Sequence, residues 1–275
     1  MAEYVERYEN LAEFLTKRGI LVTGEDHLGH GKSVSEGGSF GYFCEQDPAT
    51  VVVRDVHRLK KITEEQYPQV PYIILGHSMG SFIARNYLCR YGSGIGGAVI
   101  VGTGMQPAGL IFASKAMAGI QKLFCGSKHV SHFIDKAAFG GYNKRIDSPR
   151  TSSDWLSRNT ENVDRYIADE LCGFTFTVNG FQTLFELIRR LQKQENLEKV
   201  PQNLPILMVS GAEDPVGDYG KGVRKACDSL KKAGVKNITV KLYENDRHEL
   251  LNEEDGEQAM EDIYQWIRRE IPGLD

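Results

Sequence analysis

Three side chains in this sequence have the types and the order needed for nucleophilic catalysis by a serine. Ser78 stands in the motif GHSMG, residues 76–80, and Asp214 and His248 follow it along the chain. A serine hydroxyl is a good nucleophile only when a histidine accepts its proton and a carboxylate holds that histidine in one tautomer. The pattern therefore predicts attack on an acyl carbonyl by Ser78, with His248 as the base and Asp214 as the acid.

The elements around these residues are those that such a site needs. A Gly-x-Ser-x-Gly turn exposes its serine only between a strand and a helix, and Tyr72–Leu75 reads as the strand and 81–91 as the helix. Asp214 directly follows the strand-like run LPILMV, and His248 follows the strand-like run ITVKLY. One helix and one strand fit between Asp214 and His248, so we expect their two loops to lie side by side.

Short β-branched runs alternate with amphipathic helical stretches along most of the chain, which is typical of an α/β fold with a mostly parallel sheet flanked by helices. Residues 105–202 break this alternation, because they contain helical segments and many aromatic side chains but no clear strand. The sequence predicts a core of residues 1–104 and 203–275 with 105–202 as an inserted helical cap, and extra helical core is the other interpretation of 105–202. The expected strands are 20–26, 72–78, 97–104, 204–214 and 237–244, and the expected helices include 49–67, 79–91, 219–233 and 255–270.

Other side chains compete for the same roles. Glu213 is the best substitute for Asp214 as the acid, whereas Asp218 lies beyond a turn and Asp246 is too close to His248 in the chain to orient it. We expect His77 to pack under the nucleophile turn.

Two further motifs resemble binding sites. His27 and His30 with Asp26 lack further ligands, so no metal site is predicted. The run 31–33, Gly-Lys-Ser, is similar to a phosphate-binding loop, but Asp26 occupies the place of its first glycine and would repel phosphate.

Composition excludes several function classes. The 275 residues carry a net charge of −4, which does not indicate nucleic-acid binding, and the five scattered cysteines indicate free thiols and not a disulfide framework. No apolar run is long enough for a membrane span, and the first residues do not resemble a signal peptide. We expect a cytoplasmic protein.

The motifs GHSMGS, GAEDPVG, NDRHELLNE and DHLGHGKS resemble those of the monoacylglycerol lipases or lysophospholipases of the α/β-hydrolase superfamily. The likeness covers nearly the whole chain. It implies that Ser78 is the nucleophile, Asp214 the acid and His248 the base, and that the backbone N–H of Met79 donates to the oxyanion.

The same resemblance implies a difference at the start of the chain. Relatives place an apolar strand and His-Gly before the segment that corresponds to MAEYVERY, so about three N-terminal strands are expected to be absent from this chain, one of them between 20–26 and 72–78. The second oxyanion donor would be the amide at Met1. Either Met1 is internal to a longer protein or the chain is shortened, and we expect the first.

The sequence thus predicts a serine carboxylic-ester hydrolase that cleaves monoacylglycerol or lysophospholipid-type esters through an acyl-enzyme. It needs no metal or organic cofactor, and its cap would make transient contact with membrane surfaces. Alternatives are another acyl or amide hydrolase of the same fold, such as a thioesterase or peptidase, and a catalytically impaired lipid-binding protein. Aromatic residues of the cap are candidates to receive the acyl chain, namely Phe112, Phe124, Phe174 and Phe176.

Overall fold

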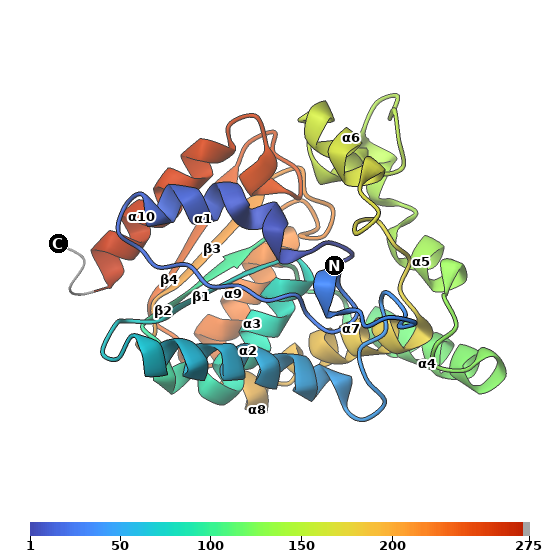
Figure 1. Ribbon diagram of the computed structural model, residues 1–275, viewed down its shortest axis with the longest axis horizontal. Coiled ribbons are helices and arrows are strands. Elements are labelled where there is room, and N and C mark those ends of the chain that lie inside the picture. Colours follow the sequence, from blue (N-terminus) through green and yellow to red (C-terminus); the bar gives the residue numbers. More distant parts are fainter. Residues whose placement is uncertain (272–275) are drawn as a thin grey trace.

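Four parallel strands form the sheet at the centre of the computed structural model, which describes residues 1–271. The order across the sheet is β1-β2-β3-β4, the same as the order along the chain (Figure 1). This arrangement confirms the predicted α/β fold with a parallel sheet. The strands are β1 (Ile73–His77), β2 (Gly97–Val101), β3 (Ile206–Gly211) and β4 (Ile238–Tyr243).

Helices cover both faces of the sheet, which explains why β2 and β3 are continuous apolar runs that are buried along their whole length. One face packs against α1 and α10, and the other is covered by α3 and α9, with α2 and α7 packed on α3 (Figure 1). The helices are α1 (Glu9–Thr16), α2 (Pro48–Gln66), α3 (Met79–Tyr91), α4 (Ala108–Cys125), α5 (His132–Phe139), α6 (Thr160–Ala168), α7 (Val178–Leu191), α8 (Gln194–Leu197), α9 (Lys221–Lys232) and α10 (Gly256–Glu270).

The inserted region between β2 and β3 contains no strand, only helices, turns and one isolated bridge between Val130 and Thr177. Its helices are not equivalent. Helix α7 packs against α2, α3 and α4, and its apolar side chains belong to the core that covers the sheet. Helices α4, α5 and α6 lie beyond it at one end of the molecule (Figure 1). We therefore propose that the covering part of the insertion is formed by its earlier helices, whereas α7 belongs to the core through its packing on α2 and α3.

The prediction of a strand at residues 20–26 is wrong, because these residues form no strand in the structure. Their sequence has the β-branched character of a strand, but a strand exists only when its backbone pairs with a neighbour. No backbone hydrogen bond joins residues 21–25 to another part of the described chain. A cavity of about 580 Å³ separates this segment from β1, and its lining includes Leu21, Val22, Ile73 and Leu75.

The cavity lies along the free edge of β1. Tyr72 accepts a hydrogen bond from Gly96, and Ser78 donates one to Val101, so the even-numbered residues of β1 turn their backbone groups toward β2. Backbone groups alternate along a strand, and those of Ile73, Leu75 and His77 therefore face the cavity. Within residues 1–271 their N–H groups have no protein partner. The backbone of β1 up to Ser78 is thus paired on the β2 side alone.

Candidate active site

Ser78 occupies the sharp turn between β1 and α3, as the GHSMG motif predicts. Its backbone has φ 55° and ψ −119°, a conformation that is costly for any residue with a side chain. The turn is held by the Ser78 N–H, which donates to the Val101 carbonyl, and by Ser81, whose N–H and hydroxyl both donate to the Ser78 carbonyl. The surrounding structure therefore fixes the Ser78 backbone in a strained geometry, which is a common property of functional sites.

The two glycines that flank Ser78 have different surroundings. A Cβ on Gly76 would lie 2.2 Å from the carbonyl oxygen of Gly80, so the close approach of β1 and α3 requires glycine at residue 76. A Cβ on Gly80 would meet no atom within 4 Å. The sequence motif predicts a steric need at both places. Only residue 76 has neighbours too close for a side chain, because Gly80 borders the cavity beside β1.

Asp214 and His248 meet behind this turn at the carboxyl edge of the sheet. The Asp214 Oδ2 lies 3.0 Å from His248 Nδ1, and both residues are almost completely buried. The other carboxylate oxygen accepts the Val216 N–H at 2.8 Å, and Ser210 donates to Oδ2 at 3.3 Å. Because the carboxylate is fixed by these donors, it can hold the His248 ring in the tautomer that leaves Nε2 free to accept a proton.

The structure separates Asp214 from its competitors. Glu213 and Asp218 are exposed, so neither lies against the His248 ring. Asp246 is buried, but its carboxylate accepts a hydrogen bond from Arg158 at 2.6 Å. Burial, together with the charges of Asp255 and Glu253, raises the pKa of Asp246 to about 6. Asp214 is therefore the carboxylate that the fold brings to His248.

The two predicted oxyanion donors lie on the same cavity lining. Met79 is the first residue of α3, where backbone N–H groups have no partner inside the helix, and its N–H has no hydrogen-bond partner in the described chain. Met1 also lines this cavity, and its amino group lies 3.9 Å from the Glu3 carboxylate. Both donor assignments remain predictions.

The four phenylalanines predicted to receive an acyl chain do not form one group. Phe176 is fully buried and its ring stacks on Phe174 at a centroid distance of 6.0 Å. Phe112 and Phe124 lie on α4 and are 77% and 85% exposed. The structure thus joins Phe174 to Phe176 beside His30, whereas Phe112 and Phe124 face outward.

His30 and Asp26, for which no metal site is predicted, have other contacts. The His30 ring is buried among phenylalanines, its Nδ1 lies 3.1 Å from the Leu28 carbonyl, and burial lowers its pKa to about 3. The Asp26 carboxylate accepts the backbone N–H groups of Val5 and Lys32, each at 2.8 Å. Both side chains serve to fix the loop after residues 20–26.

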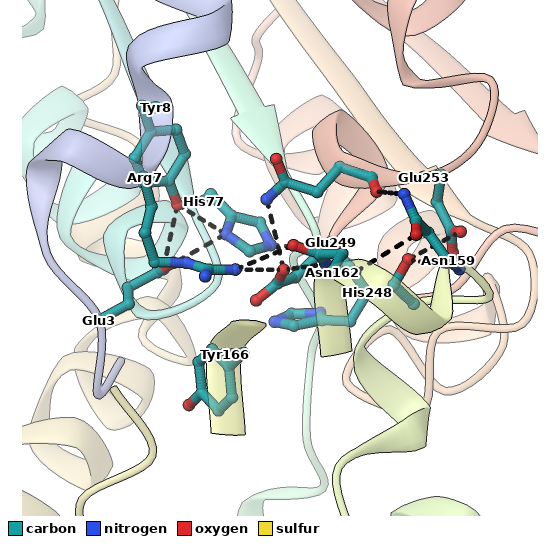
Figure 2. A network of polar contacts seen from close by, with 12 residues as sticks. Glu3, Arg7, Tyr8, His77, Asn159, Asn162, Tyr166, His248, Glu249 and Glu253 are labelled. Carbon is teal, nitrogen blue, oxygen red and sulfur yellow. Dashed lines mark hydrogen bonds and ion pairs between the residues drawn. The ribbon is translucent and has the colours of Figure 1, made fainter. Parts of the chain in front are cut away.

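Two contacts of His248 were missed by sequence reasoning. The ring centroid of Trp155, from the inserted region, lies 5.1 Å from that of His248, and the ring centroid of His77 lies 4.6 Å from it. His77, predicted only to pack under the turn, makes specific polar contacts with Tyr8 and with the His248 carbonyl, which Figure 2 shows. A single sequence does not show which distant residues will meet. The tryptophan in the predicted cap is the one sequence signal that points to a contact with the site.

Comparison with known proteins gives the same family. Residues 1–255 match the Hydrolase_4 family, described as serine aminopeptidase, S33. The chain is 28% identical to the monoglyceride lipase of Rattus norvegicus over 273 residues, covering 98% of this chain and 80% of the relative. It is 27% identical to the monoacylglycerol lipase of Mycolicibacterium smegmatis over 267 residues, covering 97% and 84% of the two chains.

Solved structures agree with this result. A thermostable carboxyl esterase from Bacillus coagulans, in complex with glycerol, superimposes with a TM-score of 0.91 at 29% identity, covering 98% of this chain and 87% of that one. A structure described as a lipase in its open form superimposes with a TM-score of 0.87 at 25% identity, covering 98% and 87%. With its parallel sheet and strained serine turn, the chain belongs to the Hydrolase_4 family of the α/β-hydrolase superfamily and is a serine ester hydrolase.

Proposed function

We propose that this protein hydrolyses the carboxylic esters of monoacylglycerols or lysophospholipid-like substrates. The observation that carries the proposal is the buried 3.0 Å contact between Asp214 and His248, at the sheet edge where Ser78 is held in strained geometry. The relatives named monoglyceride and monoacylglycerol lipase support the substrate class.

The proposed reaction has two halves. Ser78 Oγ attacks the ester carbonyl while His248 Nε2 takes its proton, and the Met79 N–H stabilises the oxygen that becomes negative. The C–O bond to the alcohol then breaks, and His248 returns the proton to that leaving oxygen. In the second half, His248 removes a proton from water, the water oxygen attacks the acyl-enzyme, and Ser78 leaves with its proton restored. Asp214 keeps the imidazole oriented in both halves.

Covalent labelling tests the nucleophile. We expect a fluorophosphonate probe to add one adduct to the intact mass of the protein, and Ser78→Ala to remove it. Ser93→Ala is the matched control, because Ser93 lies in the turn after α3 and should leave labelling unchanged. A folded wild-type chain without an adduct would contradict the proposed nucleophile.

A substrate panel then decides between the proposed activity and its alternatives. Faster turnover of monoacylglycerol or lysophospholipid than of matched thioesters and aminoacyl amides would support the proposal. Preference for a thioester or amide would instead indicate the thioesterase or peptidase alternative. Lipid binding by a folded chain that is neither labelled nor active would indicate the impaired lipid-binding protein.

The outer surface of the insertion supports the proposed contact with lipid surfaces. We define the cap surface as the exposed apolar side chains of α4 and α5, which are Leu110, Phe112, Ile120, Leu123, Phe124 and Phe133, each more than half exposed. Large apolar side chains in such a group mark interaction sites. Residues 108–145 carry six lysine or arginine residues and one aspartate, although the whole chain has a net charge of −4. Such a surface suits an anionic lipid layer. No helix within residues 1–271 is long and apolar enough to cross a bilayer.

Removing the apolar tip of the cap surface tests this contact. We expect the double variant Leu123→Ser, Phe124→Ser to bind anionic phospholipid vesicles at least roughly ten-fold more weakly, because each buried side chain contributes about 1.5–3 kcal/mol. Its turnover of a soluble short-chain ester should not change. The matched control is Ile62→Ser, since Ile62 is 46% exposed on α2. Equal vesicle flotation of the double variant and the wild type would show that this surface does not dock.

A further inference from the structure

His77 is surrounded by hydrogen-bond partners that restrict its protonation state. Its Nε2 lies 3.0 Å from the backbone carbonyl oxygen of His248, and its Nδ1 lies 2.8 Å from the hydroxyl oxygen of Tyr8. Tyr8 in turn donates to the Glu3 carboxylate at 3.0 Å (Figure 2). Glu3 and Tyr8 come from the start of the chain, and His77 is the last residue of β1.

The donors and acceptors in this series of contacts determine which atoms of His77 and Tyr8 carry protons. A carbonyl oxygen only accepts hydrogen bonds, so His77 Nε2 must carry a proton. A carboxylate also only accepts, so the single proton of Tyr8 points to Glu3, and the Tyr8 oxygen must accept from His77 Nδ1. Both ring nitrogens of His77 are therefore donors, which is true only of the imidazolium form.

The charges around His77 agree with this count. Burial works against a charged ring, but the Glu3 carboxylate, 3.6 Å from Nδ1, outweighs it and raises the pKa of His77. Burial would also raise the pKa of Glu3, but His77, the Met1 amino group and Arg7 together lower it well below its usual range. The charged or titratable groups that face His77 are Glu3 and the Met1 amino group from the start of the chain, Glu249 from the loop after β4, and the His248 ring, whose centroid lies 4.6 Å from that of His77. The uncharged hydroxyl of Tyr8 lies at Nδ1.

The same residues hold the loop that carries the proposed base. Glu249, the residue after His248, is 3% exposed, and its carboxylate accepts from Arg7 and from Asn162, each at 2.6 Å (Figure 2). Arg7 lies in the short 3-10 helix Val5–Tyr8, which precedes α1, and Asn162 lies on α6 of the inserted region. The backbone on both sides of the His248 carbonyl is thus fixed by the start of the chain, by the end of β1 and by the insertion.

We infer that His77 is a positioning residue held as an imidazolium by Glu3, and that it donates to the His248 carbonyl to fix the base of the reaction. It touches no reacting atom and acts through the His248 backbone. The protonation state stands on the hydrogen-bond geometry together with an ionised Glu3, whose carboxylate lies 3.4 Å from Arg7 Nε. The kinetic consequence rests on the proposed function.

Nuclear magnetic resonance of the full chain with ¹⁵N-labelled histidine tests the protonation state without any substrate. We expect both His77 ring nitrogens to carry protons at pH 8, where an ordinary histidine, with a pKa near 6.5, is neutral. The spectrum of His77→Gln identifies the signal among the seven histidines. Glu3→Gln should move loss of one proton to lower pH. A single protonated nitrogen at pH 7 in the wild type would overturn the inference.

Kinetics test the positioning role. We expect His77→Gln and Glu3→Gln each to lower kcat roughly 10-fold to 100-fold with little change in KM, since misplacing a catalytic group slows the chemical step. The Glu3→Gln loss should be partial at low pH, where His77 keeps its second proton, and full at high pH. His57→Gln is the control, because His57 stacks on Tyr91 at 3.9 Å, far along α2. An equal effect of Glu3→Gln at every pH would refute the charged pair.

If His77→Gln does not fold, Glu3→Gln and the spectra decide the question. If no ester is turned over, the rate of fluorophosphonate labelling replaces kcat.

Discussion

Loss of His248 is expected to lower kcat as much as loss of Ser78, by about 10⁶-fold for each alanine variant, and the double variant should be no worse than either single one. The residues of a triad act as one unit, so removing one member already removes the shared contribution. The remaining turnover would come from substrate binding and from the Met79 N–H. Ester hydrolysis by the three variants, measured against the uncatalysed rate, checks this expectation.

The kcat comparison is valid only if the Ser78 and His248 variants stay folded. His248 is 2% exposed and packs against Trp155 and His77, so a smaller side chain leaves a cavity. His248→Gln fills more of that space and should show the same loss of activity with a smaller loss in unfolding temperature. Multiplicative losses in the Ser78, His248 double variant would mean that the two residues act independently, against the proposed triad.

The second large effect is expected for Asp214→Asn, which should lower kcat by about 10⁴-fold while the fold is kept. The amide has the shape of the carboxylate, but its nitrogen can face His248 Nδ1 as a donor and so favour the wrong tautomer of the ring. The Val216 N–H, which now donates to Oδ1, can still donate to the amide oxygen, and the Ser210 hydroxyl, which now donates to Oδ2, can turn to accept from the amide nitrogen. Single-turnover kinetics on a soluble ester would measure the chemical step directly.

Asp246→Asn provides the matched control for this prediction. Asp246 lies on the same loop as His248, two residues away, and is as deeply buried as Asp214. Its carboxylate accepts from Arg158 at 2.6 Å and not from the His248 ring, and the amide oxygen of asparagine can still accept from Arg158. We expect kcat to stay within a few-fold of the wild type. A loss as large as that of Asp214→Asn would assign the orienting role to the wrong carboxylate.

Several elements could be predicted from the sequence because their signal is local. The predicted helices at 49–67 and 79–91 agree with α2 and α3, and Val223, Cys227 and Leu230 form the buried side of α9 as their spacing predicts. The place of the nucleophile turn was also local, because a strand, two glycines and a helix follow one another within 20 residues.

Other features depend on partners that a single sequence does not reveal. Residues 20–26 have the composition of a strand, but they form none without a neighbour. The apolar stripe of α7 suits a cap as well as a core, and only its packing on α2 and α3 distinguishes them. Phe124 and Phe176 look alike in the sequence, yet one is 85% exposed and the other is fully buried. The contacts of His77 join residues that are up to 171 positions apart.

The free edge of β1 also bears on how this protein behaves at high concentration. An unpaired parallel edge is a template for any extended segment, including one from a second copy of the chain. The N–H groups of Ile73, Leu75 and His77 face a cavity whose walls include Leu11, Leu15 and Ile20, so a strand that enters would gain both hydrogen bonds and apolar contacts. Domain swapping and aggregation during refolding are therefore expected to begin at this edge. A short synthetic β-strand peptide that occupies it should suppress both.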